Sequence, residues 1–109
     1  MIAANRDEYH DRPAERPTLR FAGGHSILAP TDLREGGTWL GWGAGGLFAG
    51  LTNRPVADPD PGLRSRGHLV VDVLKAGSAK RAAEGLAALP AGTVNPCNVF
   101  VADALDAFV

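Results

Sequence analysis

The chain lacks the features that would place it in a specialised class of protein. It has one cysteine in 109 residues, which excludes an internal disulfide framework and a zinc site built from cysteines. Its net charge is −1, so its charge gives no reason to expect nucleic acid or an anionic membrane as a partner. Its apolar runs are far shorter than a membrane span. The sequence therefore predicts a soluble protein in a reducing compartment, the cytoplasm.

Metal ligands and a leader segment are also missing from the pattern. His10, His25 and His68 have no spacing typical of metal ligands, so we expect no metal site. Charged residues at 6–8 interrupt any apolar segment at the start, so we expect no signal peptide. A length of 109 residues allows one domain at most.

Short apolar segments predict several strands. We expect them at residues 2–4, 27–29, 38–42, 47–52, 98–102 and 105–109. The clearest signal is the glycine-rich connection at 43–46, since glycines supply the positive φ angles that a hairpin loop needs. Residues 9–17 are predicted to be loop, because Pro13 and Pro17 restrict the backbone before them. Pro30 is expected to end its strand, and residues 31–35 to form one turn.

Two helices are predicted between the strands. The first is expected to begin at Ser65 as N-cap and to end at Gly77, with apolar residues four apart on one face. The second is expected to run from Ser78 to Pro90. The order of strands, helices and strands indicates an α+β domain, with the helices on one face of a largely antiparallel sheet.

The polar tetrad Asn5-Arg6-Asp7-Glu8 is the first candidate site. A guanidinium and carboxylates pair by charge-assisted hydrogen bonds, and an Asn offers both a donor and an acceptor. A polar turn is the alternative, because Asn and Asp suit turns. An ion pair of Arg6 with Asp7 or Glu8 that serves structure alone is also open.

The tetrad is followed by further motifs in a fixed order. They are Arg12-Pro13, Asp32-Leu33 with Gly36-Gly37-Thr38-Trp39-Leu40-Gly41, Phe48-Ala49-Gly50-Leu51-Thr52-Asn53-Arg54, and Ser65-Arg66-Gly67 with Leu69-Val70. This series closely resembles the NRDE family, also called the transport and Golgi organisation protein 2 family. The resemblance is strong over residues 1–75 and continues weakly through residues 95–98.

The resemblance implies an N-terminal-nucleophile hydrolase-like fold, in which two antiparallel sheets lie between helix layers (αββα). In that superfamily the N-terminal residue, often Cys, is both nucleophile and base. Family members typically start with Met-Cys and one further strand, whereas this chain starts with Met1-Ile2. We therefore expect residues 1–109 to be a single partial domain that lacks the first strand and the C-terminal half. Such a fragment is expected to self-associate and to be inactive as an amidase.

The resemblance also suggests residues for a site in the complete protein. Arg6 would lower the pKa of a nucleophilic thiol, and Asp7 would orient the terminal amine or Arg6. Asn53 resembles the oxyanion donor of choloylglycine-type amidases, with a turn cap before Pro55 as the alternative. The candidate binding residues are Asn5, Glu8, Thr38, Trp39 and Arg54. Cys97 is interpreted as a small packed hydrophobe and not as a substitute nucleophile.

Two classes of function stay open. The family has been connected with haem mobilisation and, in eukaryotes, with secretory organisation and lipid metabolism, which implies a carrier of haem or of another small hydrophobe. A carrier needs an apolar cleft, to which Trp39, Trp42 and Phe48 could contribute. The alternative is a cysteine amidohydrolase that acts on non-peptide C–N bonds, on the analogy of fold alone. No cofactor is expected, and haem would be cargo.

Overall fold

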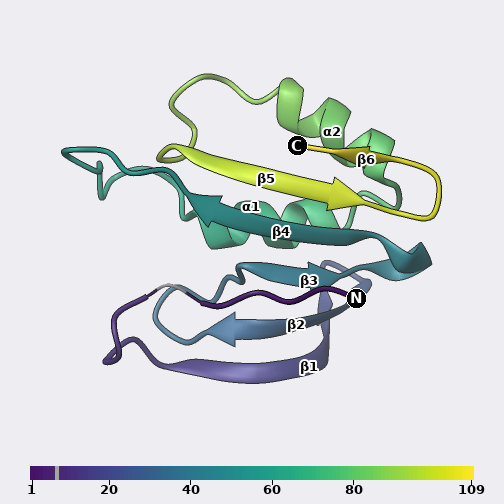
Figure 1. The fold of residues 1–109 in the computed structure, drawn as a ribbon, viewed down its shortest axis with the longest axis horizontal. Coiled ribbons are helices and arrows are strands. Elements are labelled where there is room, and N and C mark those ends of the chain that lie inside the picture. The colour runs from purple at the N-terminus through teal and green to yellow at the C-terminus, as the bar shows by residue number, and fades with distance from the viewer. Residues whose placement is uncertain (7) are drawn as a thin grey trace.

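The computed structural model describes residues 1–6 and 8–109, which form one mixed α/β unit. The strands are β1 (Ala14–Ala22), β2 (His25–Asp32), β3 (Leu40–Trp42), β4 (Phe48–Asn53), β5 (Cys97–Ala102) and β6 (Ala107–Phe108). The helices are α1 (Arg66–Leu74) and α2 (Ala79–Ala87), with a 3-10 turn η1 (Ala44–Gly46) between β3 and β4. The six strands pair in chain order in one antiparallel sheet (Figure 1).

Both helices cover one face of this sheet, as the order of elements predicts. Helix α1 contacts β3 and β4, and α2 contacts β5 and β6. Aliphatic side chains from the sheet and from both helices form the core between them, namely Ile27, Leu47, Ala49, Val70, Val73, Leu74, Ala79, Ala82 and Val101. The second sheet and second helix layer that the resemblance implies are not seen in residues 1–6 and 8–109, so the four-layer fold stays a prediction.

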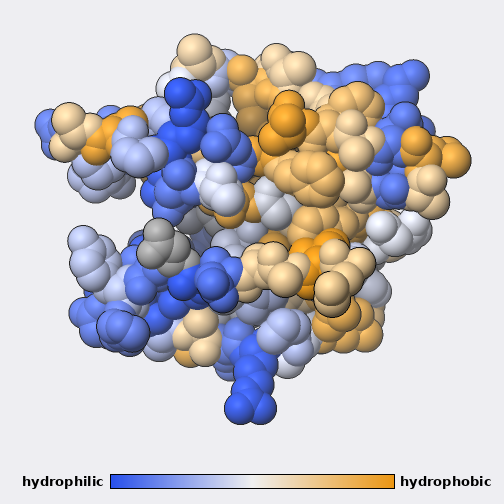
Figure 2. Space-filling view, viewed as in Figure 1, coloured by the Kyte–Doolittle hydropathy of each residue, from blue (hydrophilic) through white to orange (hydrophobic). Residues whose placement is uncertain are grey.

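The other face of the sheet carries large apolar side chains, and no helix or second sheet formed by the described residues covers it. Phe21 is 77% exposed and Leu28 and Phe100 are about 40% exposed. Trp42 and Phe48 contact each other on this face, with ring centroids 5.2 Å apart. Figure 2, drawn from the same side as Figure 1, shows apolar residues gathered over the central strands. The predicted self-association is consistent with this surface and stays a prediction, which sedimentation at micromolar concentration would check.

The prediction of loop over residues 9–17 is wrong from Ala14 onward, and β1 was missed. The register between β1 and β2 shifts between Glu15 and Thr18, so Pro17 lies in an irregularity of the ladder. Pro30 of β2 lies opposite the same shift, which explains why this strand continues to Asp32 beyond its predicted end. Proline is tolerated at a bulge and on an edge strand, because no ladder hydrogen bond is lost there.

Other predicted elements are confirmed with shifted bounds. The hairpin of β3 and β4 turns through Gly45 and Gly46, which have φ angles of +72° and +79°. The turn after β2 begins later than predicted, with the Gly36 N–H donating to the Asp32 carbonyl at 2.7 Å. Residues 2–4 form no strand, because they have no ladder to a neighbouring strand. Both helices have nine residues, and nowhere in the part of the chain that is described is a helix long and apolar enough to span a membrane.

The helix caps differ from each other. Ser78 caps α2 as predicted, because its hydroxyl accepts from the Arg81 N–H at 3.3 Å. Ser65 occupies the N-cap position of α1, but its side chain makes no capping hydrogen bond.

The fold does not address where the protein lies in the cell, so the cytoplasmic location stays a prediction.

Candidate functional site

A cleft of about 510 Å³ lies where β4 ends, α1 begins and the N-terminal segment passes. Charged and amide side chains from all three regions line it, and we call it the polar cleft. Figure 2 shows hydrophilic residues gathered around the hollowed end of the molecule. The cleft therefore brings together segments that are far apart in the sequence.

Most of the predicted site residues meet in this cleft. The lining residues among them are Asn5, Arg6, Glu8, Thr38, Trp39 and Asn53. Arg54 is not part of the lining, and its backbone N–H donates to the Pro96 carbonyl at 3.1 Å. Asp7 lies outside the described residues. Asn5, Arg6 and Glu8 of the tetrad thus line one cleft with Asn53, while the shared site and the chemical roles of these residues stay predictions.

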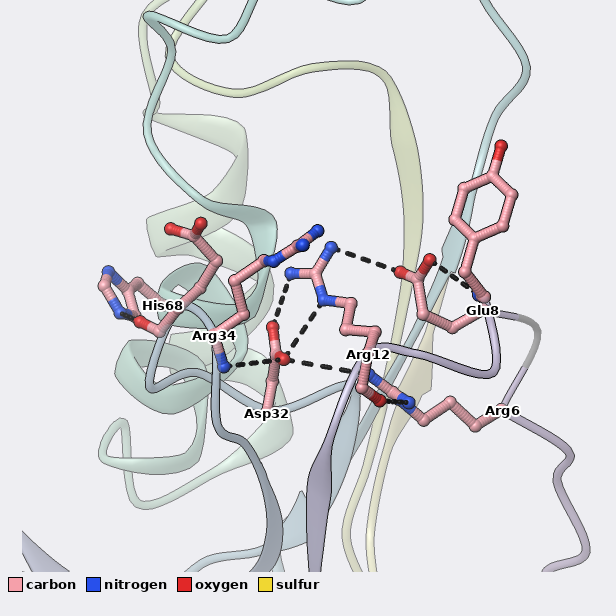
Figure 3. Close-up of polar contacts among 8 residues, drawn as sticks. Arg6, Glu8, Arg12, Asp32, Arg34 and His68 are labelled. Carbon is pink, nitrogen blue, oxygen red and sulfur yellow. Dashed lines mark hydrogen bonds and ion pairs between the residues drawn. The ribbon is translucent and has the colours of Figure 1, made fainter.

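Asp32 is the centre of the polar contacts at this cleft, a role that the sequence did not assign to it (Figure 3). Its carboxylate accepts from the Arg12 Nε at 3.1 Å and from Arg12 Nη2, and also from the backbone N–H of Arg34 at 3.3 Å. The Arg6 guanidinium lies 3.7 Å away. The hydrogen bond from Arg12 lowers the pKa of Asp32, and it raises the pKa of Arg12 in turn.

Arg6 is fixed by Asp32 and by its own neighbours. Its Nη1 donates to the Arg12 carbonyl at 2.9 Å, and its guanidinium carbon lies 4.9 Å from the centre of the Trp39 ring. Glu8 pairs with Arg12 at 3.3 Å, and no ion pair joins Arg6 to Glu8 among the described residues. The alternative pair of Arg6 with Asp7 lies outside the described residues. Because a cation over an aromatic face is stabilised by the ring quadrupole, Arg6 and Trp39 form one wall of the cleft together.

Two glycines bring α1 against the strand that leads into the cleft. A Cβ atom on Gly37 would lie 2.5 Å from the carbonyl carbon of Gly67, so the Gly37 backbone has no room for a side chain. A Cβ atom on Gly67 would also be tight, at 3.1 Å from the Thr38 nitrogen. The Thr38 N–H donates to the Gly67 carbonyl at 3.2 Å. Thr38 is 1% exposed, and its hydroxyl donates to the Leu40 carbonyl at 2.8 Å. Thr38 therefore supports the wall of the cleft with its hydroxyl already engaged.

Two arginines at the start of α1 complete the charged lining. Arg64 is paired with Asp72. Burial raises the pKa of Asp72, but the hydrogen bonds from Lys75 and Arg64 outweigh burial, so the net shift is downward. Arg66 donates to the Pro96 carbonyl at 3.2 Å. Among residues 1–6 and 8–109, Arg66 has no carboxylate partner, so its charge is available to the cleft.

An apolar pocket of about 450 Å³ adjoins the polar cleft at residues 94–97. Its lining is mostly aliphatic and comes from α1, α2, β5, β6 and the loop before β5, including Leu69, Ala83, Leu86, Val99, Val101 and Phe108. None of the aromatic residues predicted for an apolar cleft lines it: Trp39 lines the polar cleft, and Trp42 and Phe48 lie on the open face. The sequence therefore named the wrong residues for this feature.

Cys97 lies at the polar end of the apolar pocket. Burial raises the pKa of its thiol, and the charge of Arg66 opposes that shift in part. A raised pKa keeps the thiol protonated at neutral pH, which agrees with the interpretation of Cys97 as a packed residue. No group of three or more His, Cys, Asp or Glu side chains arranged to hold a metal occurs within the described ranges.

The family model for Transport and Golgi organisation 2 matches residues 1–107. The chain belongs to this family. The motifs that carry the family resemblance fall largely on the polar cleft. Their residues in its lining include Asn5, Arg6, Asp32, Asn53 and Arg66. The apolar pocket lies against the weaker part of the resemblance, near residues 95–98.

Curated relatives match part of their own length. The mouse Transport and Golgi organization 2 homolog is 42% identical over 74 residues, which are 64% of this chain and 26% of that protein. The human homolog is 39% identical over 77 residues, and the bovine homolog is 38% identical over 77 residues. The chain thus spans about a quarter of the length of the relatives that it matches.

Proposed function

We propose that this member of the Transport and Golgi organisation 2 family holds a small hydrophobe in the apolar pocket and acts as a carrier, with haem as the candidate cargo. The observation that supports this proposal is the apolar pocket itself. Its volume of about 450 Å³ falls within the usual range of small-molecule sites, and its lining is predominantly aliphatic. Each CH₂ group that a ligand buries there is stabilised by roughly 0.8 kcal/mol.

The neighbouring polar cleft supports an amphipathic cargo. Arg66 donates to Pro96, next to Cys97 of the pocket, and it has no carboxylate partner in the described part of the chain. An arginine at this boundary suits a carboxylate, because its guanidinium binds carboxylates through paired hydrogen bonds. Haem combines an apolar ring with carboxylates and fits this division between apolar and cationic surfaces.

Filling the pocket tests the proposal. We expect Ala83→Phe to weaken the binding of haemin to the full chain at least about tenfold, since the new ring would occupy the cavity and a tenfold loss needs only about 1.4 kcal/mol. Ala83 lines the pocket and is half-buried. The matched control is Ala88→Phe, because Ala88 follows α2, is exposed and does not line the pocket. Absorbance titration measures both, with circular dichroism to verify folding. Equal binding by Ala83→Phe and wild type contradicts the proposal.

A second candidate function is a cysteine amidohydrolase in the complete protein. It is supported by the presence of Arg6 and Asn53 in one cleft. In this proposal the nucleophile is the N-terminal Cys that the resemblance implies, and the surrounding fold is the four-layer αββα arrangement. Adding an N-terminal Met-Cys strand ahead of residue 1 is expected to give amidase turnover. Turnover of the present chain that Cys97→Ala abolishes would contradict this assignment.

A further inference from the structure

The segment from residue 54 to residue 63, which we call the cleft loop, forms one side of the polar cleft. Figure 1 shows it projecting beyond the end of β4 before the chain returns to α1. Every residue from 54 to 62 is exposed, so the loop has little apolar packing to hold it. Asp60, Pro61 and Leu63 nevertheless line the cleft, opposite the N-terminal segment.

The middle of the cleft loop is held by the side chain of Asn95. Its Nδ2 donates to the Asp60 carbonyl at 2.7 Å, and its Oδ1 accepts from the Asp60 N–H at 3.0 Å. The amide side chain thus takes the place of a neighbouring strand, by satisfying both backbone groups of one residue. The Asp60 carboxylate turns back and accepts from the Gly62 N–H at 2.8 Å, which shapes the loop around this point.

The two ends of the cleft loop have separate anchors. At its start the Arg54 N–H donates to Pro96, and just after its end Arg64 forms a parallel bridge with Val94. Between these ends, the hydrogen bonds that the structure gives to other parts of the described chain all come from Asn95. Release of one side chain would therefore free the middle of the loop while both ends stay attached.

We propose that the cleft loop is a lid over the polar cleft and that Asn95 is its latch. Segments with few buried contacts open locally at low free-energy cost, and here two neutral hydrogen bonds oppose the opening. Their loss should raise the open population roughly 10- to 100-fold. This inference concerns access to the polar cleft, so it stands or falls independently of any cargo in the apolar pocket.

Amide hydrogen exchange of the full chain tests the latch. In the wild type we expect protection at Asp60 and Gly62 but not at Ala57 or Asp58, whose amides have no hydrogen-bond partner among the described residues. Asn95→Ala should speed exchange at Asp60 roughly 10- to 100-fold and leave α1 and β5 unchanged. The matched control is Asn98→Ala, because Asn98 bonds Thr52 on the exposed face and does not contact the loop. Unchanged exchange at Asp60, or faster exchange throughout the chain, would overturn the latch.

Quenching of Trp39 fluorescence by acrylamide tests the lid. Trp39 lines the polar cleft, and Trp42→Phe leaves it as the single tryptophan. In that background Asn95→Ala should raise the quenching constant, since an open loop exposes the cleft to a neutral solute, and Asn98→Ala should not. An equal constant in both variants would show that the loop does not cover the cleft.

Discussion

The polar cleft and the apolar pocket meet at residues 94–97, yet their side chains are satisfied in opposite ways. In the cleft, the charged groups around Asp32 are committed to one another, with Arg12 and Arg6 both directed at Asp32. In the pocket, polar groups are few, and the Thr93 hydroxyl is already donated to the Pro90 carbonyl at 2.6 Å. One region is built from directional bonds and the other from contact between aliphatic surfaces.

This difference predicts different responses to mutation. Removing one member of a charge network leaves its partners desolvated without compensation, so a change in the cleft should lower the stability of the fold. A change of side-chain volume in the pocket breaks no hydrogen bond, so it should alter binding more than folding. The two regions can therefore be separated by measuring stability and ligand binding on the same variants.

The largest effect is expected from Asp32→Ala. Asp32 is 9% exposed, and its removal leaves Arg12 and Arg6 without their shared carboxylate. We expect the free energy of unfolding to fall by about 3 kcal/mol, as measured by urea denaturation. Asp11→Ala, which removes an exposed carboxylate from the same segment, should change it by less than about 0.5 kcal/mol. Similar losses for both variants would contradict the central role of Asp32.

A somewhat smaller loss is expected from Gly37→Ala. The added Cβ would meet the backbone of Gly67 and push α1 away from the strand beside the cleft, at a cost of about 2 kcal/mol. Gly85→Ala is the opposite control, because a Cβ there meets nothing within 4 Å and helix α2 should gain about 0.5–1 kcal/mol. Equal effects of the two substitutions on urea denaturation would refute the close contact.

The sequence predicted the residues of the cleft better than the contacts among them. Asn5, Arg6, Glu8, Trp39 and Asn53 were all named because the motifs that carry them are polar and follow one another in a recognised order. The central role of Asp32 was not predicted, because Arg12 and Asp32 are 20 residues apart and meet across the β1–β2 hairpin. That hairpin was not predicted, since Pro13 and Pro17 indicated loop where β1 begins and Pro30 was expected to end the second strand.

The apolar pocket could not have been predicted from pattern alone. Ala83, Leu86, Val99 and Val101 have the spacing of ordinary core residues, and periodicity shows only that they face inward. Whether the space between such residues is filled or empty depends on how their volumes fit in three dimensions. The fold class, the hairpin of β3 and β4 and both helices were predictable, because their signals are local.

The dependence of the unfolding free energy on acid pH should also distinguish the polar cleft from the apolar pocket. The hydrogen bond from Arg12, followed by the bond from Arg34 and the nearby charges, lowers the pKa of Asp32 below its unfolded value of about 3.9. The stabilisation is therefore complete above about pH 4 and is lost as the pH falls through the folded pKa. We expect Asp32→Asn to flatten part of the decline in unfolding free energy below about pH 4, while Ala83→Phe in the pocket keeps the wild-type slope. A full slope in Asp32→Asn would exclude Asp32 as a source of this acid sensitivity.

The smallest effect is expected where the two regions touch. Burial raises the pKa of Cys97 in the apolar pocket, and Arg66 in the polar cleft lowers it in part, so the cleft acts on the pocket through charge. Arg66→Ala should therefore raise that pKa and slow alkylation of Cys97 by N-ethylmaleimide about twofold at fixed pH, since a partly exposed charge is worth well under 1 kcal/mol. Arg64→Ala is the matched control, because the Arg64 guanidinium is engaged by Asp72. Equal slowing in both variants would mean that general surface charge, and not the position of Arg66 beside Pro96, sets the reactivity of Cys97.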